Sequence, residues 1–157
     1  MGGKVEIREG DFETPALAVL LRHHYTTSRE VTPGGNAHVF PIDRLRAEDI
    51  RFWSFWRDKA VVGFGGLKRL SPTQAEVKSM HVAASFRGQG MGEQILSHID
   101  AAAQEMGIKT MFLETGTVDY FLPARRLYQR CGYVECGPFA TYGVDPQSTY
   151  MMKDLRP

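Results

Sequence analysis

A glycine-rich turn is the stretch of this sequence whose residue types most directly indicate chemistry. Residues 87–92 read Arg-Gly-Gln-Gly-Met-Gly, so three glycines fall within five positions. Glycine lets the backbone approach a ligand closely and adopt positive φ angles. A run with helical periodicity follows, and the first amides of a helix lack intrahelical partners and attract anions. The turn is therefore a seat for a phosphate group.

Two common nucleotide-binding motifs do not fit this turn. A P-loop needs two glycines separated by four residues and then Lys and Ser or Thr, whereas Gly92 is followed by Glu93 and Gln94. The dinucleotide fingerprint matches at Gly88 and Gly90, but its third glycine would fall at Glu93, whose charge would oppose a second phosphate. An unrelated nucleotide-binding enzyme is therefore disfavoured. A plain strand-to-helix turn without a ligand remains the alternative.

A second motif lies downstream of the Arg-x-x-Gly-x-Gly turn. Residues 124–133 read Ala-Arg-Arg-Leu-Tyr-Gln-Arg-Cys-Gly-Tyr, a helical run that ends in Leu-Tyr, three residues, Gly and an aromatic. On these motifs, and on the order of elements over residues 76–134, the sequence resembles the GNAT superfamily of acyl-CoA-dependent N-acyltransferases. Residues 114–120 and 137–142 resemble its uncharacterised bacterial small-molecule acetyltransferases. The resemblance implies an α/β (α+β) fold with a central mixed, mostly antiparallel sheet and helices on both faces.

The resemblance also implies acetyl-CoA as the cofactor. In the family the glycine turn wraps the pyrophosphate of coenzyme A, and acetyl-CoA enters beside the end of the preceding strand. The implied cofactor-binding residues are Met80, His81, Val82, Arg87, Gly88, Gln89, Gly90, Met91, Gly92 and Tyr128.

The implied reaction is transfer of the acetyl group to the primary amine of a small molecule, by direct attack in a ternary complex. Two alternatives stay open: a catalytically silent acyl-CoA-binding sensor on the same fold, and a protein or peptide N-acetyltransferase. Polyamines, amino acids, aminoglycosides and protein N-termini all fit the sequence. In the family, the acceptor site is commonly lined by the region between the first two helices.

Three side chains are candidates for taking a proton from the amine. A free alkyl amine has a pKa near ~10, so it arrives protonated at neutral pH. Glu76 lies near the start of the strand that leads to the turn, where some family members place a carboxylate base, but it could instead pair with Lys78. Glu114 lies in an apolar strand, where a carboxylate needs a partner or a function. His81 titrates in the useful range and could be base or ligand.

Tyr128 is the candidate acid for the departing thiolate. Its family counterpart points at the thioester sulfur, and a phenol of pKa near ~10 can protonate a thiolate whose conjugate acid lies near ~8.5. The alternative is a tyrosine that packs on a helix face beside Leu127. One departure from the family pattern is Phe121, where many members carry an Asn that contacts the cofactor.

Hydrophobic periodicity predicts the elements that carry these residues. Expected strands span residues 5–8, 50–57, 60–70, 75–82, 110–115, 133–136 and 150–155, with the second and third forming a hairpin. Expected helices run from Thr14-Pro15 to about His24, over residues 41–45, from Met91 to a cap at Gly107, and onward from Pro123, with a loop at 28–36 and an extended segment at 38–40. The aromatic residues of 52–56 are core or a ring-lined acceptor site. Glycines at 63, 65 and 66 indicate a bulge or a close backbone approach.

Composition narrows the remaining functional classes. A length of 157 residues predicts one N-acetyltransferase domain over residues 1–157. A net charge of +1 and the absence of a basic run give no footprint for nucleic acid or an anionic membrane. No apolar run approaches ~18 residues, and no signal peptide is present, so a cytoplasmic protein is expected. Cys131 and Cys136 are expected to be reduced thiols, with no metal site. The expected partner is a small-molecule amine, and a homodimer is compatible.

Overall fold

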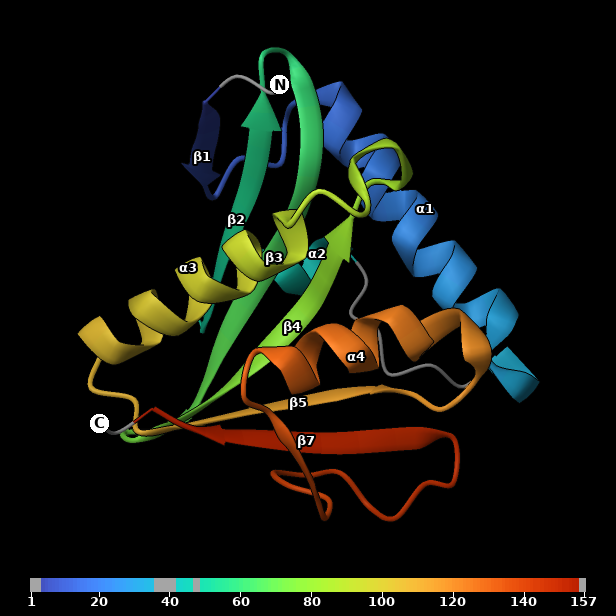
Figure 1. Ribbon diagram of the computed structural model, residues 1–157, viewed down its shortest axis with the longest axis vertical. Coiled ribbons are helices and arrows are strands. Elements are labelled where there is room, and N and C mark those ends of the chain that lie inside the picture. Colours follow the sequence, from blue (N-terminus) through green and yellow to red (C-terminus); the bar gives the residue numbers. More distant parts are fainter. Residues whose placement is uncertain (1–3, 36–41, 47–48, 156–157) are drawn as a thin grey trace.

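A computed structural model describes residues 4–35, 42–46 and 49–155 (Figure 1). The strands form one seven-stranded sheet in the order β1-β2-β3-β4-β5-β7-β6. The strands are β1 Val5–Glu9, β2 Ile50–Arg57, β3 Ala60–Ser71, β4 Gln74–Val82, β5 Thr110–Gly116, β6 Val134–Cys136 and β7 Ser148–Asp154. The α-helices are α1 Pro15–Val31, α2 Ile42–Leu45, α3 Met91–Glu105 and α4 Leu122–Arg130, and short 3-10 turns cover Pro33–Gly35, Ala84–Phe86 and Asp119–Phe121.

The sheet opens between β4 and β5. Within the described residues every neighbouring pair of strands is antiparallel except this one, which is parallel. The two strands pair only from Gln74 opposite Thr110 to Glu76 opposite Phe112. Beyond these pairs they diverge into a V that Figure 1 shows plainly. The mixed, mostly antiparallel sheet that the sequence predicted is therefore confirmed, and it leaves an opening at the carboxyl end of β4.

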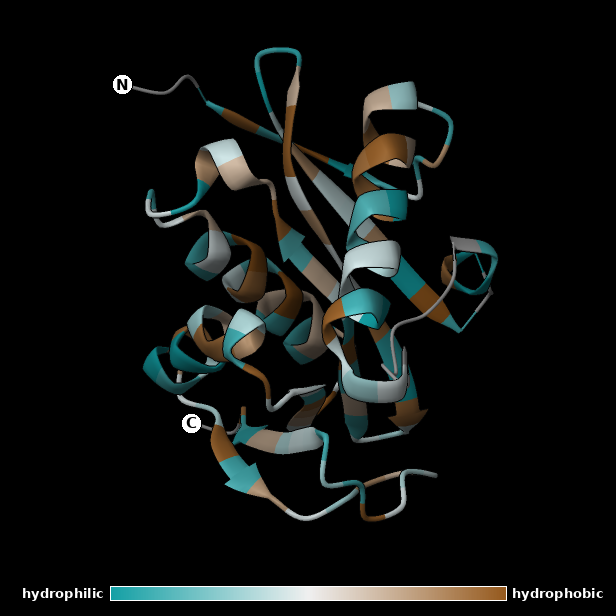
Figure 2. Cartoon of the chain, turned by 90° about the vertical axis from the view of Figure 1, so that its right-hand side faces the viewer, coloured by the Kyte–Doolittle hydropathy of each residue, from teal (hydrophilic) through white to brown (hydrophobic). Residues whose placement is uncertain are grey.

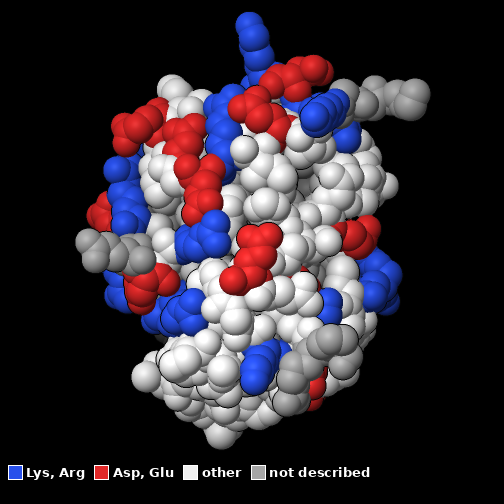
Figure 3. Space-filling model, turned by 90° about the vertical axis from the view of Figure 1, so that its left-hand side faces the viewer, with Lys and Arg blue, Asp and Glu red and all other residues white. Residues whose placement is uncertain are grey.

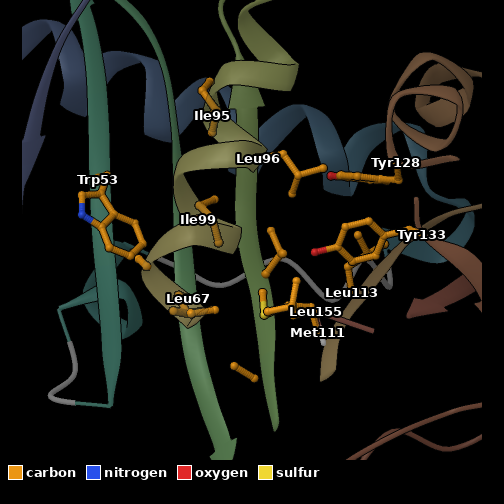
Figure 4. Close-up of a cluster of buried hydrophobic side chains, with 14 of the residues drawn as sticks. Trp53, Leu67, Ile95, Leu96, Ile99, Met111, Leu113, Tyr128, Tyr133 and Leu155 are labelled. Atoms are coloured by element: carbon orange, nitrogen blue, oxygen red, sulfur yellow. The ribbon is translucent and has the colours of Figure 1, made fainter. Parts of the chain in front are cut away.

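Helices cover both faces of the sheet, as predicted. Leu17 and Leu21 of α1 pack with Phe52 and Phe64 on one face, and α1 carries both hydrophilic and hydrophobic residues along its length (Figure 2). On the other face α3 contributes the larger core cluster, drawn in Figure 4. Its members include Trp53, Phe55, Leu67, Ile95, Leu96, Ile99, Met111 and Leu113. The aromatic side chains of β2 are thus core on both faces, and they line neither of the cavities described below.

Glycines in β3 let α3 lie close against the sheet. A Cβ at Gly63 would stand 2.8 Å from Ile95 Cδ1, and one at Gly65 would stand 2.7 Å from Ile99 Cδ1. Strand β3 also carries one extra residue in its pairing with β2, where Phe55 lies opposite Gly63 and Trp56 opposite Val61, so the expected bulge and close approach are both present. Because α3 is held this close, its first turn lies beside the end of β4.

Helix α1 is longer than the sequence predicted. It continues to Val31, so the expected loop is wrong over residues 28–31. The misleading feature was polarity, because the apolar stripe stops before Ser28, yet Ser28 is only 3% exposed and faces the interior. Thr14 occupies the N-cap position but makes no side-chain cap, since its hydroxyl donates to Asp11 Oδ2 at 2.8 Å. The expected extended segment at 38–40, Pro41 and Asn36 lie outside the described residues.

The other predicted elements agree with the structure to within two residues at each end. A buried polar network ties three of them together. Tyr133 Oη donates to Asp100 Oδ1 at 2.8 Å, and Lys153 Nζ donates to Asp100 Oδ2 at 2.9 Å. These bonds join α3, β7 and the chain that leaves α4. Both cysteines are free thiols, as expected.

Candidate active site

Two cavities meet beside Tyr128 where the sheet opens. The larger, of about 420 Å³, lies between the end of β4, the start of α3 and α4. The smaller, of about 100 Å³, lies between α1, β4, β5 and α4. Both are lined by His24, Met80, Phe121, Ala124 and Tyr128. A molecule in one cavity would therefore adjoin a molecule in the other at this boundary.

The larger cavity brings together the residues predicted to bind the cofactor. All of them line it except Gln89. The side chain of Gln89 donates to Ser85 O at 3.3 Å and accepts from Arg57 Nη1 at 3.1 Å, so it fixes the shape of the turn. The sequence therefore predicted residues that line the cavity, together with Gln89, whose side chain instead stabilises the turn.

The three glycines of the turn are required for two different reasons. Gly88 and Gly90 have φ angles of 76° and 78°, which favour glycine. Gly90 is the N-cap of α3 and offers no side chain to the first amides of the helix. Gly92 is helical, but a Cβ there would stand 2.7 Å from Leu127 Cδ2, so it sets the spacing of α3 and α4. The turn thus leaves backbone donors uncapped at the cavity wall.

Tyr128 stands on α4 at the boundary of the two cavities. It is 7% exposed, and its ring lies 6.1 Å from that of Tyr133. In Figure 4 both hydroxyls point into the cluster on the α3 side. Among the described residues none hydrogen-bonds the Tyr128 hydroxyl. Burial, and secondarily the charge of Glu114, raise the pKa of Tyr128 well above its ordinary value, so the phenol keeps its proton at neutral pH.

Glu76 lies in the smaller cavity as part of a buried triad. Lys78 Nζ donates to Glu76 Oε2 at 3.1 Å, and Tyr142 Oη donates to the same oxygen at 2.7 Å. Lys78 also donates to Tyr142 Oη at 3.0 Å. The pairing with Lys78 that the sequence allowed is present, but it is buried rather than solvated. Burial lowers the pKa of Lys78, and the charge of Glu76 opposes that shift.

Glu114 lines the smaller cavity from β5, on the opposite side of the opening from β4. Its Oε2 accepts a hydrogen bond from Ser148 Oγ at 2.8 Å. Glu114 is only partly buried in a strand whose alternate residues Leu113 and Thr115 are buried. Burial therefore alternates along the strand, and the smaller cavity is lined by Leu113 and Thr115 as well as by Glu114.

His81 and His24 form a pair that the sequence reasoning missed. Their Nδ1 atoms lie 3.1 Å apart, with ring centroids at 4.7 Å. Burial lowers the pKa of His81 to about 3 and that of His24 to about 4, so both rings are neutral at pH 7. Periodicity extends the predicted helix only to about His24 and assigns this side chain no partner. The spacing Leu17, Leu21, His24, Ser28 places all four on one helix face, which was the available signal.

Comparison with known proteins identifies the family. A family model described as an acetyltransferase (GNAT) domain matches residues 48–135. The chain belongs to the GNAT family. It is 36% identical over 151 residues to the uncharacterized N-acetyltransferase YsnE of Bacillus subtilis, covering 96% of this chain and 100% of that one. It is 34% identical over 127 residues to a protein of Azospirillum brasilense named IAA acetyltransferase, covering 80% and 82%.

The fold agrees with solved GNAT structures. A GNAT family acetyltransferase from Elizabethkingia anophelis, solved with acetyl-CoA bound, aligns with a TM-score of 0.70 at 19% identity and covers 96% of this chain and 97% of that one. The protein is thus an acyltransferase whose family uses acetyl-CoA. The larger cavity of this GNAT domain suits that molecule, because uncapped amides at the start of α3 can donate hydrogen bonds to phosphate oxygens. Arg87 adds positive charge to its wall, and Arg130 lies there paired with Glu93 at 2.9 Å.

Three further observations concern metal ligands, membrane-spanning helices and surface charge. Over the described ranges, no group of three or more His, Cys, Asp or Glu could hold a metal ion. No described helix is long and apolar enough to cross a membrane. On the face shown in Figure 3, basic side chains are interspersed with acidic ones rather than gathered in a patch of one sign.

Acid should destabilise this GNAT fold through the histidine pair. Both folded pKa values lie below the ordinary value of 6.5, so the unfolded chain binds more protons between pH 6.5 and about 4. The free energy of unfolding should therefore fall as the pH is lowered through this window, by up to about 1.4 kcal/mol per pH unit for each ring.

The variant His24→Gln removes one titrating ring and should make this slope shallower. Thermal unfolding of both proteins between pH 6.5 and 5 measures it, and parallel slopes would show that His24 does not titrate with a lowered pKa.

Proposed function

We propose that this GNAT protein transfers the acetyl group of acetyl-CoA to the primary amine of a small molecule, by direct attack in a ternary complex. The observation that carries the proposal is the junction of two cavities beside Tyr128. Direct attack needs both substrates in place together, with the amine against the thioester carbon. A cavity suited to acetyl-CoA that adjoins a second, smaller cavity meets this need.

Glu114 is the proposed base, in preference to Glu76 and His81. The Glu76 carboxylate already accepts bonds from Lys78 and Tyr142, which hold its charge in a buried network. His81 faces the larger cavity and its pKa is lowered to about 3, which makes it a weak base. Glu114 Oε2 accepts a hydrogen bond from Ser148, and the side chain borders the smaller cavity beside Tyr128. It is the carboxylate best placed to take the proton of an incoming ammonium group.

Tyr128 is the proposed acid. Acetyl-CoA supplies the thioester: the amine nitrogen forms a bond to the acetyl carbon, and the carbon–sulfur bond breaks. One ammonium proton goes to Glu114 before the attack, and the Tyr128 hydroxyl gives its proton to the departing sulfur. The nitrogen loses a second proton as the amide forms, and this proton restores the Tyr128 phenol. The raised pKa of Tyr128 keeps that proton in place before the reaction. A thiolate in the same buried surroundings is also destabilised, which favours the transfer.

The cofactor is proposed to bind along the wall of the larger cavity, through the 87–92 turn and the strand end at Met80, His81 and Val82. A catalytically silent sensor is the second candidate, but it would have no need of a second cavity at Tyr128. A protein or peptide acceptor is less well suited, because the smaller cavity holds only about 100 Å³.

Release of free thiol from acetyl-CoA in the presence of single amines tests the proposal. The panel should contain hydroxylated amines, alkyl amines, amino acids and a polyamine, together with IAA, because the Azospirillum brasilense relative is named for it. We expect amine-dependent release well above hydrolysis, and mass spectrometry should identify the N-acetyl product. Tight acetyl-CoA binding without release for any acceptor would favour the sensor.

A further inference from the structure

Three buried polar atoms without partners line the smaller cavity. They are Ser28 Oγ, Ser79 Oγ and Gln147 Oε1, and none has a hydrogen bond within the described chain. A buried polar atom left unpaired has lost its hydrogen bonds to water without gaining others, so such atoms are rare and call for an explanation. They come from α1, from β4 and from the loop before β7, which are far apart in the sequence. Their convergence on one cavity indicates a site for a hydrogen-bonding ligand.

The main chain at each of the three residues is held by its own element. Ser28 is 3% exposed in the last turn of α1, where Thr32 Oγ1 donates to its carbonyl at 2.7 Å. The backbone of Gln147 is fixed on both sides, since its amide donates to Asp145 Oδ1 at 2.9 Å and its carbonyl accepts from Thr117 N at 3.2 Å. Ser79 lies at the bulge of β4 with a φ angle of 55°.

The backbone conformation of Ser79 also supports a ligand site at this cavity. A serine at positive φ is strained, and strained residues cluster at functional sites.

The charges around the cavity select against a carboxylate. Glu76 and Glu114 are acidic, and the cation among the lining residues described is Lys78, which Glu76 and Tyr142 already engage. His24 adds no charge at neutral pH, because burial lowers its pKa to about 4. The two carboxylates thus favour a ligand with a cationic amine. The unpaired polar atoms can form hydrogen bonds with the remainder of that ligand, but they offer no positive charge to balance a carboxylate.

We infer that the smaller cavity binds the acceptor as a compact, hydroxylated primary amine without a carboxylate group. Its ammonium group lies toward Glu114, and its hydroxyls bond to Ser28, Ser79 and Gln147. Gln147 Oε1 can only accept, so it pairs with a hydroxyl hydrogen. The volume, that of about three water molecules at roughly 30 Å³ each, limits this part of the acceptor to a few atoms. The inference rests on the proposed function for the identity of the bound molecule as acceptor.

Binding of three matched amines to the protein saturated with coenzyme A tests the inference. The amines are 2-amino-1,3-propanediol; 3-aminopentane, which replaces both hydroxyls by methyl groups; and serine, which replaces one hydroxymethyl group by a carboxylate. Calorimetry should show the diol binding about 10- to 100-fold more tightly than either of the others, since each net hydrogen bond is worth up to about tenfold. Affinities within threefold of one another would overturn the inference.

Ser28→Ala gives a second, independent measurement. The variant should reduce the preference for the diol over 3-aminopentane by about tenfold. Its melting temperature should stay level or rise, because it removes a buried hydroxyl that has no partner. Ser97→Ala, at an exposed position of α3, is the matched control and should change neither. An unchanged preference together with a lowered melting temperature would make Ser28 a structural residue and overturn its role here.

The two proposals fail in different ways. If the diol binds preferentially but no amine releases thiol from acetyl-CoA, the proposed function is wrong and the ligand class of the cavity stands. If several amines release thiol at equal efficiency and bind equally, the proposed function stands and this inference is wrong.

Discussion

Tyr128→Phe is expected to lower kcat by about 100- to 10,000-fold, the usual contribution of general acid catalysis. The leaving thiolate gains charge at the junction of the cavities, where Tyr128 is 7% exposed and keeps its proton at neutral pH. Phenylalanine keeps the ring and its packing against Tyr133 but has no proton to give. The variant should bind acetyl-CoA almost as tightly as the wild type, because the lost hydroxyl acts mainly in the transition state.

Thermal unfolding distinguishes this role from a structural one. No described residue hydrogen-bonds the Tyr128 hydroxyl, so its removal orphans no partner and the melting temperature should change little. If the melting temperature falls sharply while kcat stays within about twofold, the hydroxyl has a structural function and the mechanism needs another acid.

Glu114→Gln is expected to lower kcat by a comparable factor of about 100 or more, with little change in acetyl-CoA affinity. Glutamine keeps the shape of the side chain and can still accept the hydrogen bond from Ser148, but it cannot take a proton. Steady-state kinetics at saturating acetyl-CoA measure the loss.

Glu76→Gln is the matched control, since it makes the same chemical change in the same cavity. It removes the charge that pairs with buried Lys78, so its main effect should be a lowered melting temperature. The roles are reversed if Glu76→Gln abolishes turnover while Glu114→Gln is fully active across pH. If neither variant slows turnover, the proton leaves through water or His81.

The lining of the larger cavity could be predicted from the sequence because its signals are local. The glycines at 88, 90 and 92 and the Leu127-Tyr128 motif each fall in a short stretch, and periodicity assigned the elements around them. The smaller cavity could not be read in this way. Ser28 and Gln147 are polar residues outside the predicted helices and strands, and nothing in their local sequence indicates burial. Only the fold shows that both are buried beside β4 at the smaller cavity.

Two further residues illustrate the same limit. The predicted helix reached only about His24, whereas α1 continues to Val31 and carries His24 against His81. Tyr142 was expected to cover the acceptor pocket or to pack in the sheet core. It bonds to Glu76 and Lys78 across more than 60 positions of sequence, a contact that no local pattern encodes.

The divergence of β4 and β5 has a consequence for the ligands this fold can accept. After Glu76 on one strand and Phe112 on the other, neither strand has a partner across the gap, so two rows of backbone N–H and C=O groups line an interior edge of the sheet. Water can solvate such an edge, and so can an extended ligand whose own amides repeat at the spacing of a strand. Such a ligand binds through hydrogen bonds to the main chain. These bonds do not depend on the side chains along the edge, so most of those side chains can be replaced without loss of the bonds.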